Sequence, residues 1–451
     1  MLTHKQCRTW LARGGVAFVL AGSSLSASAL DLLESYRAGL AQDAEFQAAK
    51  AALEARREEV PMARAQLLPN VGINATRMQN DLTTTQNLLG QSSTFDSNYD
   101  SKNYSLSLRQ PLYRPMQFAA YEQSFTRLAS AEAAFEKAKQ DLAVRVATAY
   151  FNLLLAEEGL RQVEIQKSAI EIQLSAASLA LKVGHGTRTD VDDAQARLDL
   201  NTAKRLAARQ QVRQARHELE ILIDRPVQSV ASVNARRLEL AAMEPASLDD
   251  WLLMAETANP ELRDMKSRVE TARFEVDRAS SGHKPTLDLI AQRTLNVSDN
   301  VTNPNSRYLN NQIGVQLSVP LYAGGYVNAQ VRSALASLAG AEQAYESARR
   351  KLSTQVRKEF QGVEEGILRV KALEQAERSA DQSVYSNEKG FKAGTRSRVD
   401  ILNAEESRGN TRLELVRARF EYVLSRIRLL ALCGVVGSEE IEAVNRWLGD
   451  S

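Results

Sequence analysis

LSLRQPLY, at residues 106–113, returns as VQLSVPLY at residues 315–322. A second stretch, VGHGTRTDV at residues 183–191, returns as AGTRSRVDI at residues 393–401. The shared order and nearly equal spacing indicate that the chain is an internal duplication. Each half combines two alternating segments with one very long helical pattern. Such a half cannot bury its faces alone, so it needs its twin and further copies of the chain.

The composition favours long helices and excludes two classes of protein. Helix-forming residues dominate the 451 positions and only 10 residues are proline, which is typical of long helices or coiled coils. Without the three basic residues of its first segment, the chain has 54 basic against 55 acidic residues. It therefore lacks the positive charge of a nucleic-acid-binding protein. Cys7 lies in that segment and Cys433 stands alone, so no disulfide framework is expected.

Residues 1–29 are typical of a secretory signal peptide. A positive start is followed by a short apolar run, residues 15–25, and then by the small residues Ala27-Ser28-Ala29. We expect cleavage before Leu30, because an uncleaved membrane anchor needs about 20 apolar residues and this run is shorter. No cysteine follows the cut, so a lipid has no attachment site there.

Two pairs of segments alternate apolar and polar residues with the period of a β-strand. Residues 71–77 and 104–109 form the first pair, and residues 286–294 and 313–319 form the second. One face of each segment is apolar and the other is small and polar, a pattern typical of outer-membrane barrels with a wet lumen. The alternative is two half-buried hairpins in a soluble sandwich.

Four strands are too few to close a barrel around a pore, and lipid does not tolerate open strand edges. A barrel would therefore need several chains. Residues 81–101 and 296–311 are rich in Asn, Ser and Thr and are predicted as loops. Since barrels place their long loops outward, both are expected to face the cell exterior.

A long helical pattern follows each pair of predicted strands and ends at a glycine-containing turn. In residues 115–181 the apolar positions follow steps of three, four and seven, which is the seam of a coiled coil. A helix of that length is about 100 Å long. Residues 352–373 repeat the pattern in the second half. Each long helix ends at a glycine, Gly184 or Gly394, where a positive φ is expected.

These patterns divide the chain into nine segments. The mature chain opens with a helix, residues 31–64, that is broken or bent near Pro61. The full division is a signal peptide (1–29), helices of the first half (30–68), the first β-hairpin (69–114), the first long helical hairpin (115–222), a mixed segment (223–258), a helix opening the second half (259–283), the second β-hairpin (284–322), the second long helical hairpin (323–433) and a C-terminal segment (434–451).

Four further stretches identify a family. TAYFN at residues 148–152, GHKPTLDL at 282–289, PLYAGG at 320–325 and GTRSRVD at 394–400 resemble the TolC family of outer-membrane efflux and secretion channels. The likeness covers essentially the whole mature chain. It implies a mainly α fold with a β-barrel portion, in which three chains give four strands each to one twelve-strand outer-membrane barrel. A long α-helical coiled-coil tunnel would continue this barrel into the periplasm.

The resemblance also implies where the channel closes. A periplasmic gate latch would join Arg396 of one hairpin to Thr189 and Asp190 of another. Phe391 stands where the family can place a tyrosine, so the hydrogen bond of that hydroxyl would be absent. The alternative is that Asp190 only caps a helix, as acidic residues commonly do where a helix begins.

A second implied site is a constriction ring. Asp400 would keep one of two carboxylate rings found in the family, and Asn403 replaces the other, which leaves a weaker trap for cations. Capping alone is again the alternative for Asp400. The hairpin-tip turns are also candidates for docking a periplasmic adaptor; these residues are Gly184, Gly186, Gly394 and Thr395.

The predicted function is an outer-membrane conduit of a tripartite exporter in a Gram-negative bacterium. The resemblance implies a homotrimer in outer-membrane lipid, a periplasmic adaptor (membrane fusion protein), and an inner-membrane ABC transporter or proton-driven pump as partners. Type I protein secretion is favoured, and the outer-membrane component of a multidrug efflux pump is the alternative. A soluble periplasmic coiled-coil adaptor or scaffold is a third possibility.

No catalytic site is expected. Acidic neighbours such as Glu157-Glu158 point about 100° apart on a helix and do not face one site. The three histidines of the mature chain, His185, His217 and His283, lie far apart in sequence without a His-Glu-x-x-His pattern. We therefore predict no enzyme activity, no cofactor, no metal and no nucleic-acid partner.

Overall fold

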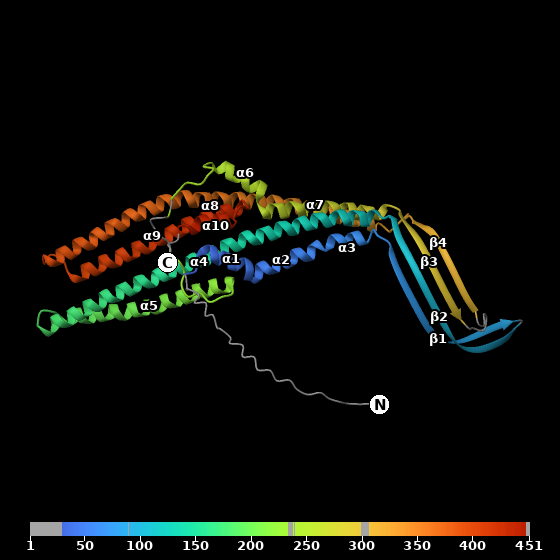
Figure 1. Ribbon diagram of the computed structural model, residues 1–451, viewed down its shortest axis with the longest axis horizontal. Coiled ribbons are helices and arrows are strands. Elements are labelled where there is room, and N and C mark those ends of the chain that lie inside the picture. Colours follow the sequence, from blue (N-terminus) through green and yellow to red (C-terminus); the bar gives the residue numbers. More distant parts are fainter. Residues whose placement is uncertain (1–28, 89, 233–237, 239, 299–305, 448–451) are drawn as a thin grey trace, which may run out of the picture.

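The computed structural model describes residues 29–447, except residues 89, 233–237, 239 and 299–305. The predicted signal peptide lies outside the described residues apart from Ala29. The molecule is a long rod with its strands at one end and two helical hairpin tips at the other (Figure 1). Along the described helices, no stretch combines the length and the apolarity that a membrane crossing requires.

Four strands form one antiparallel sheet in the order β1-β2-β3-β4. They are β1 (Asn70–Leu88), β2 (Gln91–Tyr113), β3 (Thr286–Ser298) and β4 (Ser306–Ser318). The two hairpins keep the register of the duplication, since Gly72 faces Ser107 in the first and Asp288 faces Gln316 in the second. Within the chain β1 and β4 are the two edges of the sheet.

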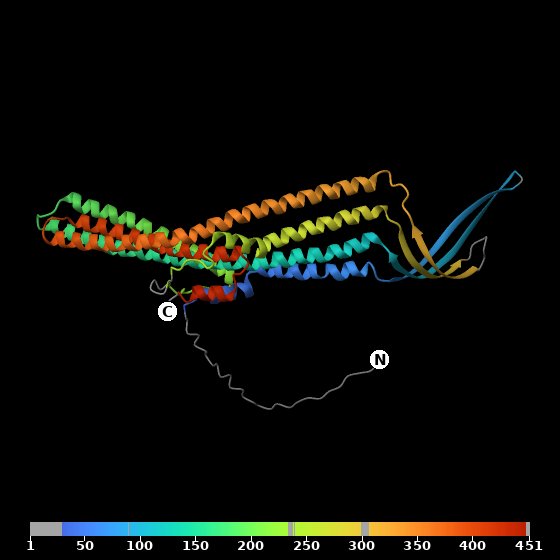
Figure 2. The ribbon, with the colours of Figure 1, turned by 90° about the horizontal axis from the view of Figure 1, so that it is seen from above.

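The prediction of a loop at residues 81–101 is wrong. β1 and β2 stay paired as far as Leu88 and Gln91, and polar side chains bond across them, as Thr83 does to Asp96 at 2.7 Å between side-chain oxygens. β3 accompanies β2 only from Ser101 onward, so a two-stranded ribbon projects past the sheet (Figure 2). A ribbon with no buried face needs no apolar alternation, and its residues therefore lack the strand period.

The second predicted loop, residues 296–311, is also partly strand. β3 continues to Ser298 and β4 begins at Ser306, where the two residues pair with each other. Residues 299–305 lie outside the described part of the chain.

The helical segment before the sheet is broken twice. It consists of α1 (Leu32–Gln42), α2 (Ala44–Arg57) and α3 (Glu59–Ala65). Asp43 separates the first two and caps α2, because its carboxylate accepts the amide of Phe46 at 2.8 Å. Glu58 separates the last two. The break expected near Pro61 thus lies just before that residue, which sits near the start of α3, where proline is tolerated.

The rod itself consists of long helices. They are α4 (Pro115–Lys182), α5 (Arg188–Ile223), α7 (Pro260–Ser280), α8 (Tyr326–Lys392) and α9 (Arg398–Leu432), and the short helix η1 (Ser281–His283) leads from α7 to the sheet. Near the sheet, α2, α4, α7 and α8 lie side by side in one layer (Figure 2). Farther down, α4 with α5 and α8 with α9 form two hairpins. A layer one helix thick leaves two broad faces uncovered in a single chain.

The main hydrophobic core lies at the middle of the rod, where α1, α4 and α9 meet the irregular segments, α6 (Leu248–Ala258) and α10 (Ser438–Asn445). Tyr150 of α4 is fully buried there. Its hydroxyl donates to the carbonyl oxygens of Ala231 and Leu30, at 2.7 and 3.2 Å. The segment at Leu30 is therefore attached directly to the long helix.

Candidate functional site

The two hairpin tips, at the end of the rod opposite the sheet, are built alike (Figure 1). Gly184 follows α4 with φ +80° and Gly394 follows α8 with φ +76°. Equivalent amides in the two tips donate to carbonyls of the preceding helix, His185 to Ala180 and Thr395 to Gly390, both at 2.9 Å. Glycine is the residue that adopts this positive φ without strain.

Both helices that leave the tips begin with a capping box. The carboxylate of Asp190 accepts the amide and the hydroxyl of Thr187, at 3.0 and 2.7 Å. The carboxylate of Asp400 accepts the amide and the hydroxyl of Ser397, at 2.8 and 2.9 Å. The predicted latch residue and the predicted ring residue therefore have the same local role.

Capping favours the charged form of both carboxylates. The hydroxyl and the backbone of Thr187 hold the pKa of Asp190 below its usual range. The amide and the hydroxyl of Ser397, with the charge of Arg396 as a lesser cause, do the same for the pKa of Asp400. Near neutral pH each tip therefore carries a fixed negative charge at the start of a helix.

Arg396 lies in a space that a glycine provides. A Cβ atom on Gly390 would come within 2.6 Å of the Cγ atom of Arg396. In the first tip the repeat places Gly186 at the position of Arg396 and Ala180 at that of Gly390. A Cβ atom on Gly186 would lie 2.9 Å from the amide nitrogen of Leu181 and 3.0 Å from the Cβ of Ala180. The glycine thus occupies opposite members of the equivalent pair of positions in the two tips, and only the second tip has room for a long cationic side chain.

The predicted latch does not form within one chain. Thr189, Asp190 and Arg396 are all exposed, and among the described residues Arg396 makes no ion pair with Asp190. Phe391 stands where the family can place a tyrosine. The centroid of its ring lies 4.9 Å from the guanidinium carbon of Arg398, which is a cation–π contact. A latch between different chains remains a prediction.

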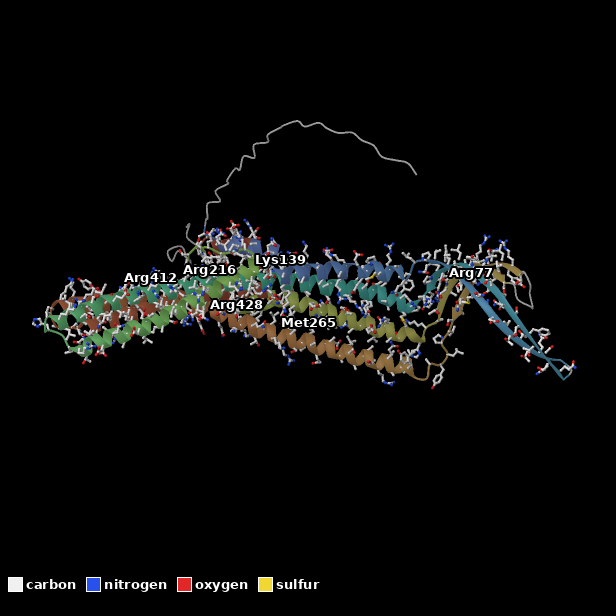
Figure 3. The ribbon with its side chains drawn as sticks, turned by 90° about the horizontal axis from the view of Figure 1, so that it is seen from below. Arg77, Lys139, Arg216, Met265, Arg412 and Arg428 are labelled. Atoms are coloured by element: carbon white, nitrogen blue, oxygen red, sulfur yellow. The ribbon has the colours of Figure 1, made fainter. Side chains whose placement is uncertain are left out.

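Polar contacts join the two hairpins between their tips and the middle of the rod. Glu158 of α4 lies 3.4 Å from Arg412 of α9, which Figure 3 labels partway along the hairpins. Burial alone raises the pKa of Glu158, but hydrogen bonds from Arg161 and Gln162 outweigh it and lower the pKa. Gly409 allows the helices to approach, since a Cβ atom there would lie 3.3 Å from Oε1 of Gln162.

Asn403 takes part in a second connection between the hairpins. Its side-chain oxygen accepts a hydrogen bond from Nη1 of Arg197 at 3.4 Å, and the ion pair of Lys204 with Glu406, at 3.7 Å, lies nearby on the same two helices. The candidate second ring position is therefore paired with a cation of its own chain.

Sequence reasoning missed Gly390 and the contact of Glu158 with Arg412. The repeat held a signal for the first, because Ala180 and Gly186 align with Gly390 and Arg396. Nothing in the spacing relates Glu158 to Arg412, which come from different halves. Among the described side chains, no group of three of the ligating types is arranged to hold a metal ion.

Comparison with known proteins gives the following likenesses. Residues 36–223 and 251–435 match the model of a family described as outer membrane efflux protein. The alkaline protease secretion protein AprF of Pseudomonas aeruginosa is 32% identical over 445 residues, which are 98% of this chain and 92% of the relative. The proteases secretion protein PrtF of Dickeya chrysanthemi is 29% identical over 431 residues, 95% of this chain and 93% of the relative.

The fold also matches solved structures. The CmeC outer membrane channel of Campylobacter jejuni superposes with a TM-score of 0.76, covering 92% of this chain and 89% of that channel. The sequences are 16% identical, so this likeness concerns the fold alone.

Proposed function

The chain belongs to the outer membrane efflux protein family, and from this premise we propose that it is the outer-membrane conduit through which an exporter secretes a polypeptide. The predicted resemblance to the TolC family is confirmed, as is the mainly α fold with a β-barrel portion. The protein is an outer-membrane protein whose helices extend into the periplasm. Its relatives are named as channels and secretion proteins, and we infer a conduit without catalytic activity.

The observation that carries the proposal is the four-stranded sheet with two free edges. Lipid does not tolerate unpaired edges, so β4 of one chain must pair with β1 of the next until the ring closes. The single-layer helices then enclose a tunnel instead of a core. Three chains per ring follow from the family resemblance.

Polypeptide cargo is supported by the relatives. AprF and PrtF are both named for the secretion of proteases, and each aligns over more than nine-tenths of this chain. We infer type I secretion, with an inner-membrane ABC transporter and a periplasmic adaptor as partners. Multidrug efflux, with a proton-driven pump, is the second candidate, since the matching family is described as outer membrane efflux protein.

We further propose that the tips hold the gate. Arg396 of one chain would reach Thr189 and Asp190 of a neighbouring hairpin, and three Asp400 carboxylates would ring the axis. The four turn residues Gly184, Gly186, Gly394 and Thr395 would form the end that meets the adaptor. The exposure of the tips and the room around Arg396 support these assignments.

Two measurements test the function. The purified protein should run as a trimer in mild detergent and form pores in planar bilayers. Expressed with the ABC transporter and adaptor of a protease exporter, in a strain lacking its own outer-membrane component, it should restore extracellular protease activity. Restored drug resistance without restored protease secretion would favour the efflux pump. A monomer that forms no pores would contradict both candidates.

Alanine at Gly390 should open the resting channel. Its methyl group would displace the Arg396 side chain, so Gly390→Ala and Arg396→Ser should both raise resting conductance severalfold in planar bilayers. The double variant Gly390→Ala, Arg396→Gly copies the steric solution of the first tip. It should restore wild-type amide exchange at the turn while conductance stays high.

The matched control is Ala180→Gly, which changes the equivalent position of the other hairpin and should leave conductance unchanged. Should the double variant conduct like the wild type, Arg396 is only a packing element of the tip. Should Gly390→Ala and Arg396→Ser both conduct like the wild type, the latch assignment is wrong.

A further inference from the structure

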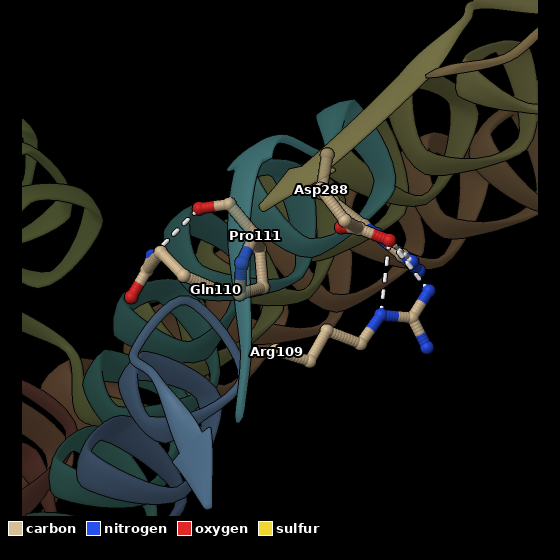
Figure 4. A network of polar contacts seen from close by, with 5 residues as sticks. Arg109, Gln110, Pro111 and Asp288 are labelled. Carbon is tan, nitrogen blue, oxygen red and sulfur yellow. Dashed lines mark hydrogen bonds and ion pairs between the residues drawn. The ribbon is translucent and has the colours of Figure 1, made fainter. Parts of the chain in front are cut away.

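A buried carboxylate lies where the sheet joins the helices. The side chain of Asp288, near the start of β3, is only 3% exposed and forms ion pairs with two arginines. Nε and Nη2 of Arg109 donate to Oδ2 of Asp288 at 2.9 and 2.5 Å (Figure 4). Nε of Arg114 donates to Oδ1 at 2.8 Å, and its Nη2 donates to Oδ2. Both carboxylate oxygens are therefore satisfied by charged donors, as a buried charge requires.

The two arginines stand on either side of the change from strand to helix. Arg109 belongs to β2, and Arg114 immediately precedes α4. Between them, the side chain of Gln110 donates to the carbonyl of Leu67, which precedes β1, at 3.0 Å. One cluster thus attaches β3 to β2, to α4 and to the approach of β1.

The duplication supplies a built-in comparison. The registers of the two hairpins superpose, which places Gly72 at the position of Asp288. The repeat likewise places Ser318 at the position of Arg109, Val319 at that of Gln110 and Ala323 at that of Arg114. None of these four residues is charged.

The boundary equivalent to β2–β3 is the one between β4 of one chain and β1 of the next. By the repeat, Gly72 of one chain would face Pro320 of its neighbour as Asp288 faces Pro111 within the chain. The boundary inside each chain is therefore joined by one buried carboxylate and two more exposed arginines, and the boundary between chains would carry neutral residues at the equivalent positions.

We propose that Asp288, Arg109 and Arg114 form a junction lock that fixes the sheet on the helices of each chain before the chains join. This inference rests on the proposed ring of chains. A charge at the equivalent place on a free edge would have no partner until assembly, and an unpaired charge is costly to bury. Keeping the charges on the inner boundary lets each chain complete them alone, so that association buries none.

The test compares two isosteric substitutions. Asp288→Asn removes the buried charge. Asp100→Asn, the matched control, removes an exposed carboxylate that pairs with Arg77 at 2.6 Å in the ribbon. In unheated detergent gels of outer membranes, Asp288→Asn should lower the trimer-to-monomer ratio severalfold while helix content by circular dichroism is kept. Asp100→Asn should match the wild type, and equal ratios for the two variants would overturn the lock.

A transplanted lock gives the converse test. Gly72→Asp with Ala323→Arg would place an ion pair across the boundary between chains, and a Cβ atom on Gly72 would meet only Oγ of Ser107 at 3.7 Å. The double variant should raise the temperature at which trimers dissociate by more than the two single variants combined. A purely additive effect would overturn the predicted equivalence of the two boundaries.

The junction lock can also be tested independently of the proposed function. A wild-type protein that runs as a monomer would contradict the ring of chains. The lock is then decided by trypsin cleavage after Arg109, which Asp288→Asn should accelerate and Asp100→Asn should not. Equal cleavage in both variants would overturn it.

Discussion

Alanine in place of Tyr150 is expected to remove about 3 to 5 kcal/mol from the stability of each chain. The ring is fully buried in the core at the middle of the rod, and it lies edge-on to Phe151 with the centroids 5.7 Å apart. Its hydroxyl also holds the carbonyls of Leu30 and Ala231. The substitution leaves a cavity and removes the hydroxyl contact between α4 and Leu30.

Phenylalanine at the same position separates the two contributions. Tyr150→Phe keeps the ring but removes the hydroxyl that donates to the carbonyl of Ala231, whereas the carbonyl of Leu30 keeps the amide of Ala231 at 2.9 Å. An unsatisfied buried acceptor is expected to cost about 1 to 3 kcal/mol. In thermal unfolding followed by circular dichroism in detergent, the melting temperature should be highest for the wild type, lower for Tyr150→Phe and lowest for Tyr150→Ala. Tyr385→Phe is the control, because that side chain is exposed. A melting curve of Tyr150→Phe that overlays the wild type would show that the hydroxyl contributes nothing.

Asparagine in place of Asp400 is expected to weaken cation selectivity and the block of the pore by multivalent cations from the periplasmic side. Three carboxylates around one axis concentrate cations, and such focusing raises local concentration by about tenfold or more. Asp400→Asn keeps an oxygen that can accept the amide of Ser397, so the helix stays capped while the charge is lost. The affinity of a trivalent blocker should therefore fall by about the same factor.

Asp190→Asn is the matched control, because Asp190 has the same capping geometry on the other hairpin. It should leave cation preference unchanged, although the loss of a proposed latch residue should raise resting conductance. Reversal potentials in a salt gradient and blocker titrations in planar bilayers measure both variants. If the two variants behave alike, Asp400 is a cap and no ring exists.

The family resemblance predicts that Asn403→Asp deepens the block by restoring a second carboxylate ring. The structure indicates a smaller effect, because Arg197 of the same chain already donates a hydrogen bond to Asn403. A carboxylate there would pair with Arg197 first, and the gain in block should be smaller than the loss in Asp400→Asn.

Features that depend on local period or on turn chemistry could be predicted from the sequence. The long helices follow from the spacing of apolar residues, and the turns at Gly184 and Gly394 follow from the need for a positive φ. The ribbon of β1 and β2 could not be predicted. Its pairing joins polar residues such as Thr85 and Thr94, and no buried face imposes an alternating pattern on them.

Contacts between distant segments were equally out of reach. Asp288 meets arginines that lie 179 and 174 residues earlier in the chain, and in the sequence it looks like one polar residue in an apolar strand. The fit of Arg396 against Gly390 spans only six positions. It still depends on where a Cγ atom lies after the turn closes, which no periodicity reports.

The length of α4 limits how an exported polypeptide can fold. The helix has 68 residues and is therefore about 100 Å long, and a fully extended chain covers at most about 3.3 to 3.6 Å per residue. At least about 30 residues of a cargo would be hidden in the tunnel at any moment. A secreted domain would thus begin folding outside the cell while its last 30 or so residues were still enclosed, so that its trailing segment would join the fold last.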